Sequence, residues 1–281
     1  MSQVQSTAAF FDVDGTLLPP PSLEWRFVSY LLGRDKLDTA NILRWLVNVA
    51  LSLPRGARRA IEANKSYVAG LPVSLVTDWV DSFAEGHSNC GLLGIFQEGL
   101  VRVRWHQSLN HRIFLVTGTL APLAKHFADN LPGRAESIAT ELAVSIRAGA
   151  YAPCFAMRTE SGAPKISSEN PDFPVWTGEL AGEHIVGDAK RRAVQSLATR
   201  HDLDLTNCYA YGNSWGDRAM LEAVGHPEVI NPSRRLTSAA RKRGWPISQW
   251  ASTETSKHKT FARSMILSAL PGPPSAEKSR S

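Results

Sequence analysis

The sequence contains few cysteines. There are three in 281 residues, Cys90, Cys154 and Cys208, and they are scattered along the chain. Metal-binding cysteines usually occur in closely spaced pairs, so this distribution does not predict a cysteine metal site. We interpret all three as reduced thiols, which are typical of proteins in a reducing compartment such as the cytoplasm.

Long apolar segments are also missing. The longest mostly apolar stretch, 42–53, is interrupted by Arg44 and Asn48. It is shorter than the roughly 20 residues that a helix needs to span a bilayer. The first residues lack both a basic region and a long apolar run, so we expect no secretory signal. Together with the cysteines, these absences predict a cytoplasmic protein.

The overall composition allows a globular enzyme without selecting its reaction. Hydrophobic residues make up 43% of the chain, which is enough to bury a full core and one accessory domain. The formal net charge of +5 suits an anionic substrate or surface. We expect no nucleic-acid partner, because no base-reading motif or aromatic platform accompanies the charge.

Two acidic residues follow the first apolar run. Residues 10–18 read Phe-Phe-Asp-Val-Asp-Gly-Thr-Leu-Leu, which predicts a buried strand that ends in an acidic loop. Alternate side chains of a strand face opposite ways, so Asp12 and Asp14 should share one side. Two close carboxylates need a cation or a proton between them, and Mg²⁺ with a phosphoryl substrate meets that need. An ordinary turn is the alternative interpretation.

A second segment offers an anion site. Residues 112–117 predict a strand that delivers Thr117 and Gly118 to the sheet edge, with a helix beginning at Thr119 or Leu120. A hydroxyl and free backbone N–H groups at a helix start can bind an anion. A threonine that only caps the helix explains the same residues equally well.

A basic residue and a second acidic loop complete the pattern. Lys190 lies in the first turn of a helix predicted to open at 187–190, where its charge opposes the helix dipole. A residue that works against its local structure is a candidate for function. Residues 208–217 predict a strand that ends in a loop containing Asn213 and Asp217. This loop has the composition of the second half of a metal site.

In this order the four segments resemble the motifs of the haloacid dehalogenase superfamily, most closely its phosphoserine phosphatase-like subfamily, over residues 8–250. The resemblance implies that Asp12 is the nucleophile of an aspartyl-phosphate mechanism and that Asp14 is the general acid and base. It also implies that Thr117, Gly118 and Lys190 bind the substrate phosphate, and that Lys190 acts in catalysis by neutralising the charge of the nucleophile and of the phosphoryl oxygens.

The resemblance further implies a bound Mg²⁺, with Asp12, Asp14, Asn213 and Asp217 as the metal-site residues. The family normally has an aspartate where this chain has Asn213. An asparagine carbonyl can ligate a hard cation, but it contributes no charge. Three interpretations therefore stay open: Asn213 binds the metal weakly, Asp217 takes its place, or the site is impaired.

From these residues we expect a magnesium-dependent phosphomonoester hydrolase that acts on a small phosphorylated metabolite. One alternative is a phosphatase of phospholipid head groups. Another is a catalytically weak relative that binds phosphorylated ligands, with Asn213 marking lost metal affinity. In phosphoserine phosphatases a glutamate near the first motif grips the substrate amine, but the spacing of Glu24 does not match, so serine specificity is not inferred.

The expected fold is α/β, with a Rossmann-like doubly wound parallel sheet as its core and a helical cap inserted after the first strand. The core comprises 1–19 and 107–250, and the cap comprises 20–106. Helical spacing of apolar residues supports the cap, as in the set Ile42, Leu43, Leu46, Val49 and Ala50. We expect Glu24 on a solvated face, and we expect the tryptophans of the cap to be core residues and not substrate contacts: Trp25, Trp45 and Trp79.

Two further segments depart from a simple core. Residues 140–144 and 175–180 look like the arms of a hairpin, and 152–174 form a long insertion between them. A surface loop is the favoured interpretation of this insertion, and a substrate-specific flap is the alternative. The tail, 251–281, is polar and basic. Basic amphipathic segments can rest on anionic membranes, but we favour a frayed tail. The sequence does not indicate an oligomeric state.

Overall fold

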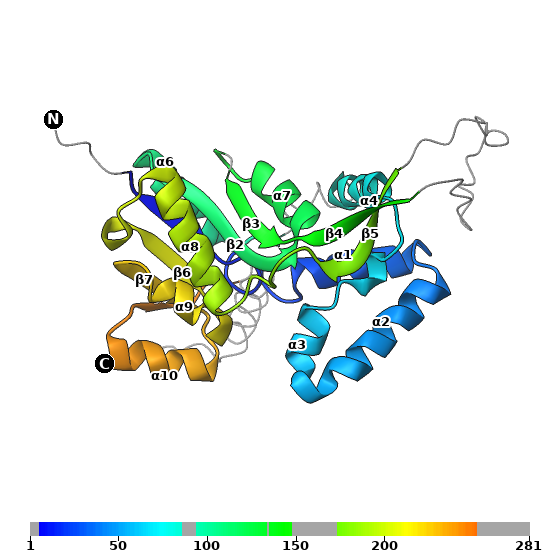
Figure 1. The fold of residues 1–281 in the computed structure, drawn as a ribbon. Helices are drawn as coiled ribbons and strands as arrows, with labels where there is room; N and C mark the ends of the chain where they lie inside the picture. Colours follow the sequence, from blue (N-terminus) through cyan, green and yellow to red (C-terminus); the bar gives the residue numbers. More distant parts are fainter. Residues whose placement is uncertain (1–5, 86–93, 134, 148–172, 252–281) are drawn as a thin grey trace, which may run out of the picture.

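The computed structural model describes residues 6–85, 94–133, 135–147 and 173–251. Its centre is a six-stranded sheet in the order β3-β2-β1-β6-β7-β8, in which every pairing is parallel (Figure 1). The predicted α/β fold with a parallel sheet is therefore confirmed. The strands are β1 Ala8–Phe11, β2 Arg112–Leu120, β3 Glu136–Thr140, β6 Tyr209–Gly212, β7 His226–Ile230 and β8 Ile247–Ser248.

Strand β1 lies in the middle of the sheet, and all four of its residues are buried. Ala9 and Phe11 pack into one hydrophobic cluster, whereas Ala8 and Phe10 pack into another. This alternation follows from the two-residue period of a strand. A strand that is apolar on both faces requires helices on both sides of the sheet.

Helices cover both faces of the sheet. Side chains of α6 and α7 belong to the first cluster, and side chains of α8, α9 and α10 belong to the second. This is the doubly wound arrangement that the sequence predicted. The bounds are α6 Gln97–Ser108, α7 Ala121–Asp129, α8 Asp188–His201, α9 Arg218–Leu221 and α10 Arg234–Arg243, with short 3₁₀ turns η4 Leu205–Asn207 and η5 Trp215–Asp217.

A second group of helices follows β1 and lies to one side of the sheet (Figure 1). The apolar residues of α1 and α4 join the same cluster as one face of β1, so this group shares a core with the sheet. The elements are α1 Leu23–Gly33, α2 Thr39–Ser52, η1 Leu53–Arg55, α3 Ala57–Glu62, η2 Ser66–Val68 and α4 Val73–Glu85.

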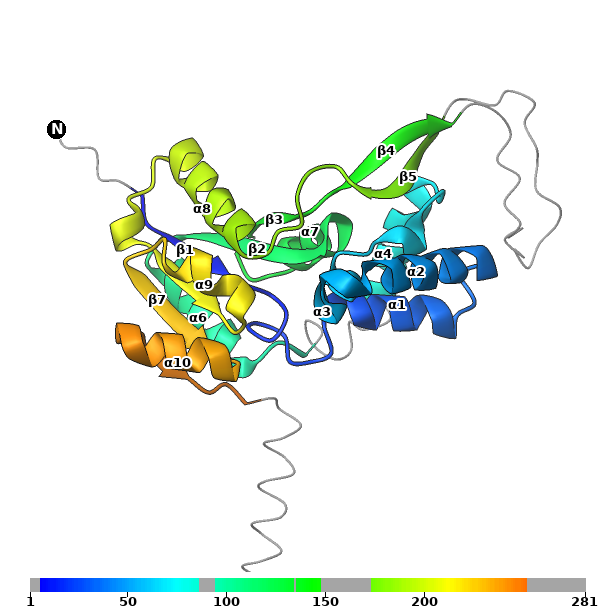
Figure 2. The ribbon, with the colours of Figure 1, turned by 60° about the horizontal axis from the view of Figure 1, so that its bottom comes forward.

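The predicted hairpin forms, and it packs on this helical group. Strands β4 Leu142–Arg147 and β5 Phe173–Leu180 pair antiparallel. Trp176 N donates to Leu71 O at 2.9 Å, and Gly70 N donates to Trp176 O at 2.7 Å. Figure 2 shows the hairpin extending from the sheet toward α4. We propose that a cap built from α1 to α4 includes this hairpin.

Helix α6 falls inside the segment 20–106 expected to form the cap, but it packs on the sheet. His106 Nε2 lies 2.8 Å from the Tyr211 hydroxyl of β6. Arg102 forms an ion pair with Glu228 of β7 at 2.7 Å. Because both contacts are to the sheet, we propose that the cap ends before α6.

The residues Leu43, Leu46 and Ala50 lie on α2 as their helical spacing predicts, and they are exposed because the opposite face of this helix packs inward. Two expectations about burial in the helical group are wrong. Trp25 is also exposed and lies on the rim of a cavity. Glu24, expected on a solvated face, is instead mostly buried beside Lys65.

Two predicted segments cannot be placed. Nearly all of the insertion, 152–172, and the tail beyond Ala251 lie outside the described residues. Within the described residues, no helix combines the length and apolarity required to cross a membrane.

Candidate active site

The acidic loop after β1 closes tightly against a second loop. Asp12 directly follows the strand, and its backbone N donates to Tyr211 O at 2.9 Å. Gly15 then turns the chain with φ +86°, a conformation that side chains disfavour. A Cβ atom on Gly15 would stand only 1.9 Å from Asn213 Nδ2. The glycine therefore permits the close approach of the loops that follow β1 and β6.

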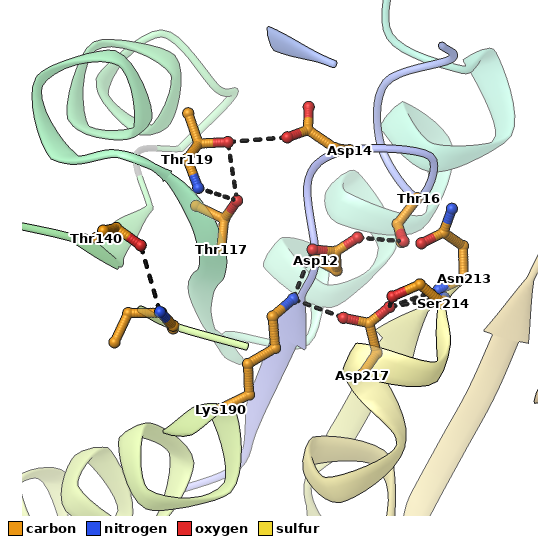
Figure 3. A network of polar contacts seen from close by, with 11 residues as sticks. Asp12, Asp14, Thr16, Thr117, Thr119, Thr140, Lys190, Asn213, Ser214 and Asp217 are labelled. Carbon is orange, nitrogen blue, oxygen red and sulfur yellow. Dashed lines mark hydrogen bonds and ion pairs between the residues drawn. The ribbon is translucent and has the colours of Figure 1, made fainter. Parts of the chain in front are cut away.

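These loops line a cavity of about 1090 Å³ between the carboxyl edge of the sheet and the helices that follow β1. This edge is where open α/β sheets bind ligands. All seven predicted site residues line the cavity: Asp12, Asp14, Thr117, Gly118, Lys190, Asn213 and Asp217. Figure 3 shows them, except for Gly118, with their polar contacts.

Lys190 joins the two loops. Its Nζ donates to Asp12 Oδ1 and to Asp217 Oδ1, each at 2.6 Å, and all three side chains are buried (Figure 3). Burial acts to lower the pKa of Lys190, but Asp12 and Asp217 outweigh it and raise that pKa above its ordinary value. The lysine is thus held in its charged form. It lies in the first turn of α8, although no strand directly precedes this helix, since β5 ends at Leu180.

Asp12 lies in an environment with too little positive charge. Burial, followed by repulsion from Asp217, raises its pKa from 3.8 to about 7, although Lys190 acts in the opposite direction. Two buried carboxylates share one ammonium group here. An additional cation beside Asp12 would favour its ionised form.

Asp217 is already saturated with hydrogen bonds. Its Oδ2 accepts from Asn213 N at 3.1 Å, Ser214 N at 2.7 Å and Ser214 Oγ at 2.8 Å, and its Oδ1 accepts from Lys190. Burial acts to raise its pKa, but Lys190 and Ser214 lower it overall. Asp217 therefore holds the second loop and Lys190 in place.

Asn213 carries a buried side-chain oxygen, Oδ1, that has no hydrogen-bond partner among the described residues. Such an orphaned acceptor is costly unless a ligand satisfies it. The described residues contain no cluster of three His, Cys, Asp or Glu side chains arranged for a metal. An amide oxygen beside a buried carboxylate is nevertheless a suitable donor pair for Mg²⁺.

Asp14 connects the sheet edge with the helices that follow it. Its Oδ1 accepts from Leu23 N, at the start of α1, at 2.7 Å, and its Oδ2 accepts from Thr119 Oγ1 at 2.9 Å. Val13, between the two acids, packs into the core. Both acids line the cavity, as strand alternation predicted.

Thr117 is buried, and its Oγ1 bonds Thr119 through both the hydroxyl, at 3.1 Å, and the backbone N, at 3.2 Å. Strand β2 continues to Leu120, which is the N-cap of α7, so a threonine does not cap this helix. A Cβ atom on Gly118 would lie 2.8 Å from His184 Nε2, so a side chain at this position would displace the imidazole ring.

The sequence analysis missed several polar residues of this cavity. Thr16 Oγ1 donates to Asp12 Oδ2 at 2.9 Å, and Thr119 supports Asp14. Thr119 could have been found, since it lies two residues beyond Thr117 on a strand. Lys65 had no sequence signal: its Nζ forms an ion pair with Glu24, whose Oε1 also accepts from the Tyr67 hydroxyl at 3.0 Å.

Comparisons with known proteins identify relatives of this chain. A family model described as haloacid dehalogenase-like hydrolase matches residues 9–164 and 161–222. Phosphoserine phosphatase SerB1 of Mycobacterium tuberculosis is 31% identical over 255 residues, which cover 86% of this chain and 70% of the relative.

Two solved structures share the fold. A protein of unknown function from Bordetella pertussis Tohama I aligns with a TM-score of 0.63 and 24% identity, over 87% of this chain and 98% of its own. A probable phosphoserine phosphatase from Vibrio cholerae aligns with a TM-score of 0.53 and 12% identity, over 96% of this chain and 70% of its own.

Proposed function

This chain belongs to the haloacid dehalogenase-like hydrolase family, in its phosphoserine phosphatase-like branch, and we propose that it is a magnesium-dependent phosphatase of small phosphomonoesters that works through Asp12. The observation that carries the proposal is the buried bridge of Lys190 between Asp12 and Asp217 at the floor of the cavity.

Asp12 is the proposed nucleophile. Its carboxylate attacks phosphorus, the P–O bond to the leaving group breaks, and an aspartyl-phosphate forms. Thr16 and Lys190 each hold one carboxylate oxygen, so the attacking group is oriented before substrate arrives. Lys190 stays charged and stabilises the negative charge of the reacting group.

Asp14 is the proposed general acid and base. It donates a proton to the leaving oxygen and then takes one from the water that hydrolyses the aspartyl-phosphate. Its contacts with Thr119 and with Leu23 N hold the carboxylate between β2 and the start of α1. Thr117 and Gly118 contribute a hydroxyl and a backbone N–H to the proposed phosphate site.

Asp12, Asp14 and Asn213 are the residues that would hold Mg²⁺, with Asp14 contributing its backbone carbonyl. The orphaned Oδ1 of Asn213 and the excess negative charge around Asp12 both support this assignment. The hydrogen bonds of Asp217 favour a supporting role for that residue, not direct ligation. When bound, Mg²⁺ would neutralise charge on the phosphoryl oxygens.

The test is phosphate release from an aryl phosphate and a panel of phosphorylated metabolites, with Mg²⁺ or with chelator. We expect release only with Mg²⁺, and a loss of at least about 10³-fold in Asp12→Asn because the nucleophile is gone. The matched control is Asp129→Asn, which changes an exposed aspartate paired with Lys125.

Full activity of Asp12→Asn would refute the mechanism. If the folded wild type releases no phosphate from any compound, the chain is instead a phospho-ligand-binding relative, and Asn213 becomes the residue to examine.

A further inference from the structure

Helix α2 exposes an apolar stripe. Leu43, Leu46, Val47 and Leu51 follow the spacing that places side chains on one face of a helix. Their exposed fractions are 62%, 50%, 47% and 69%, respectively. We call these four residues the α2 stripe. An apolar surface of contiguous large side chains on a globular protein usually marks an interaction site.

Among the described residues, only the opposite face of α2 packs against the rest of the protein. Asn41 is the buried residue of this helix, and its Nδ2 donates to Tyr67 O at 2.7 Å and to Ala69 O at 3.2 Å. Ile42 and Trp45 pack against the hydrophobic core. The helix is therefore held in place by this inner face, and folding does not require the leucines of the stripe. Figure 1 shows α2 on the outside of the molecule, away from the sheet.

Charge indicates what covers the stripe. From the N-cap of α2 to the end of α3, 38–62, the chain carries Arg44, Arg55, Arg58 and Arg59 against two acids, Asp38 and Glu62, a net charge of +2. A second copy of the chain, packed through a two-fold axis, would bring two such positive segments together. An anionic lipid surface would bury the apolar stripe at the headgroup boundary and attract the positive charge.

The catalytic cavity borders the same helices. Trp25, Trp45 and Ile61 line its cap side, and Trp25 and Ile61 are also about half exposed. We propose that the α2 stripe binds the headgroup layer of an anionic membrane and that the cavity takes an amphiphilic phosphomonoester from it. The membrane contact stands independently, whereas the substrate class rests on the proposed phosphatase function.

The first experiment measures co-sedimentation of the full chain with phosphatidylcholine vesicles, with and without phosphatidylglycerol. We expect wild type to bind the anionic vesicles. Leu46→Gln combined with Leu51→Gln should weaken this binding on the order of tenfold to a hundredfold, since two apolar side chains no longer leave water. The matched control combines Val101→Gln and Leu109→Gln, two exposed apolar residues at α6, outside the α2 stripe. This control should bind like wild type.

A second readout separates membrane contact from catalysis. Aryl phosphate hydrolysis should be unchanged in the stripe variant, whereas hydrolysis of hexadecyl phosphate embedded in anionic vesicles should fall with binding. Thermal unfolding checks that the variant is folded. Absence of aryl phosphate hydrolysis in wild type would refute the proposed function, while the vesicle binding would still report on the stripe.

The proposal would be overturned if wild type does not co-sediment with anionic vesicles, or if the stripe variant binds them as well as wild type does. Sedimentation equilibrium examines the second-copy alternative. A wild-type dimer that becomes monomeric in the stripe variant, without vesicle binding by either protein, would assign the stripe to a subunit interface and also overturn the proposal.

Discussion

Asp12→Asn is expected to abolish activity and, in metal-free protein at alkaline pH, to raise stability. The folded-state pKa of Asp12 is about 7, against 3.8 for the ordinary group. Between these values the folded protein holds a proton that the unfolded chain releases. Stability therefore falls as the pH rises from about 4 to about 7. Asparagine at this position does not ionise, so the variant does not lose this stability as the pH rises.

The size of this stability change follows from the difference between the two pKa values of Asp12. At about 1.4 kcal/mol for each pH unit, ionising Asp12 in the folded state costs about 4 kcal/mol. Asparagine can still accept a hydrogen bond from Lys190, but it loses the charge and the paired contact with Thr16, a loss of about 1–3 kcal/mol. The net expectation is a variant more stable than wild type by about 1–3 kcal/mol at about pH 8.

Urea unfolding with a chelator present, at about pH 5 and about pH 8, measures this effect. The stability difference between variant and wild type should move by about 2–3 kcal/mol in favour of the variant on going to the higher pH. Asp129→Asn should show no such pH dependence, because its side chain is exposed. A variant less stable than wild type at about pH 8, or a difference that does not change with pH, would refute the electrostatic reasoning.

Two further predictions concern single side chains. Asn213→Asp should lower the Mg²⁺ concentration needed for half-maximal activity, because it adds charge beside Asp12, while changing kcat by only severalfold. Activation of more than about a hundredfold would indicate that the natural site is impaired. His106 is buried, and burial lowers its pKa from 6.5 to about 3, so its contribution to stability is lost as the pH falls from 6.5. Between about pH 6.5 and pH 5, wild type should lose about 2 kcal/mol more than His106→Gln in urea unfolding, and equal losses would contradict this.

The central strands β1, β2 and β6 were predictable because each contains a buried run that ends close to polar or glycine residues. The run before Asp12 is buried on both faces, and such a run fits a central parallel strand. The loops that end β1 and β6 could be assigned to one site for the same reason: the carboxyl ends of parallel strands meet at one edge.

The helical group was predictable only in part. Helical spacing identified α2 correctly, but it could not tell which face would be buried, since both faces are apolar. The face that carries Asn41 is the buried one, because the side chain of Asn41 donates hydrogen bonds to backbone carbonyl groups at and just after η2. A polar residue that fixes a helix through distant carbonyl groups leaves no periodic pattern in the sequence.

By itself the sequence determined the parallel sheet, the acidic loop after β1 and the residue types gathered at its edge, because strand periodicity and turn chemistry are local. The resemblance had already implied that Lys190 neutralises Asp12, 178 residues away, but only the tertiary structure decided that Lys190 also bonds Asp217 and so bridges the two loops. It also decided that Glu24 pairs with Lys65 and that the leucines of α2 face outward. These contacts depend on where buried charges find partners and on which faces remain uncovered, and both are set by packing between segments far apart in the chain.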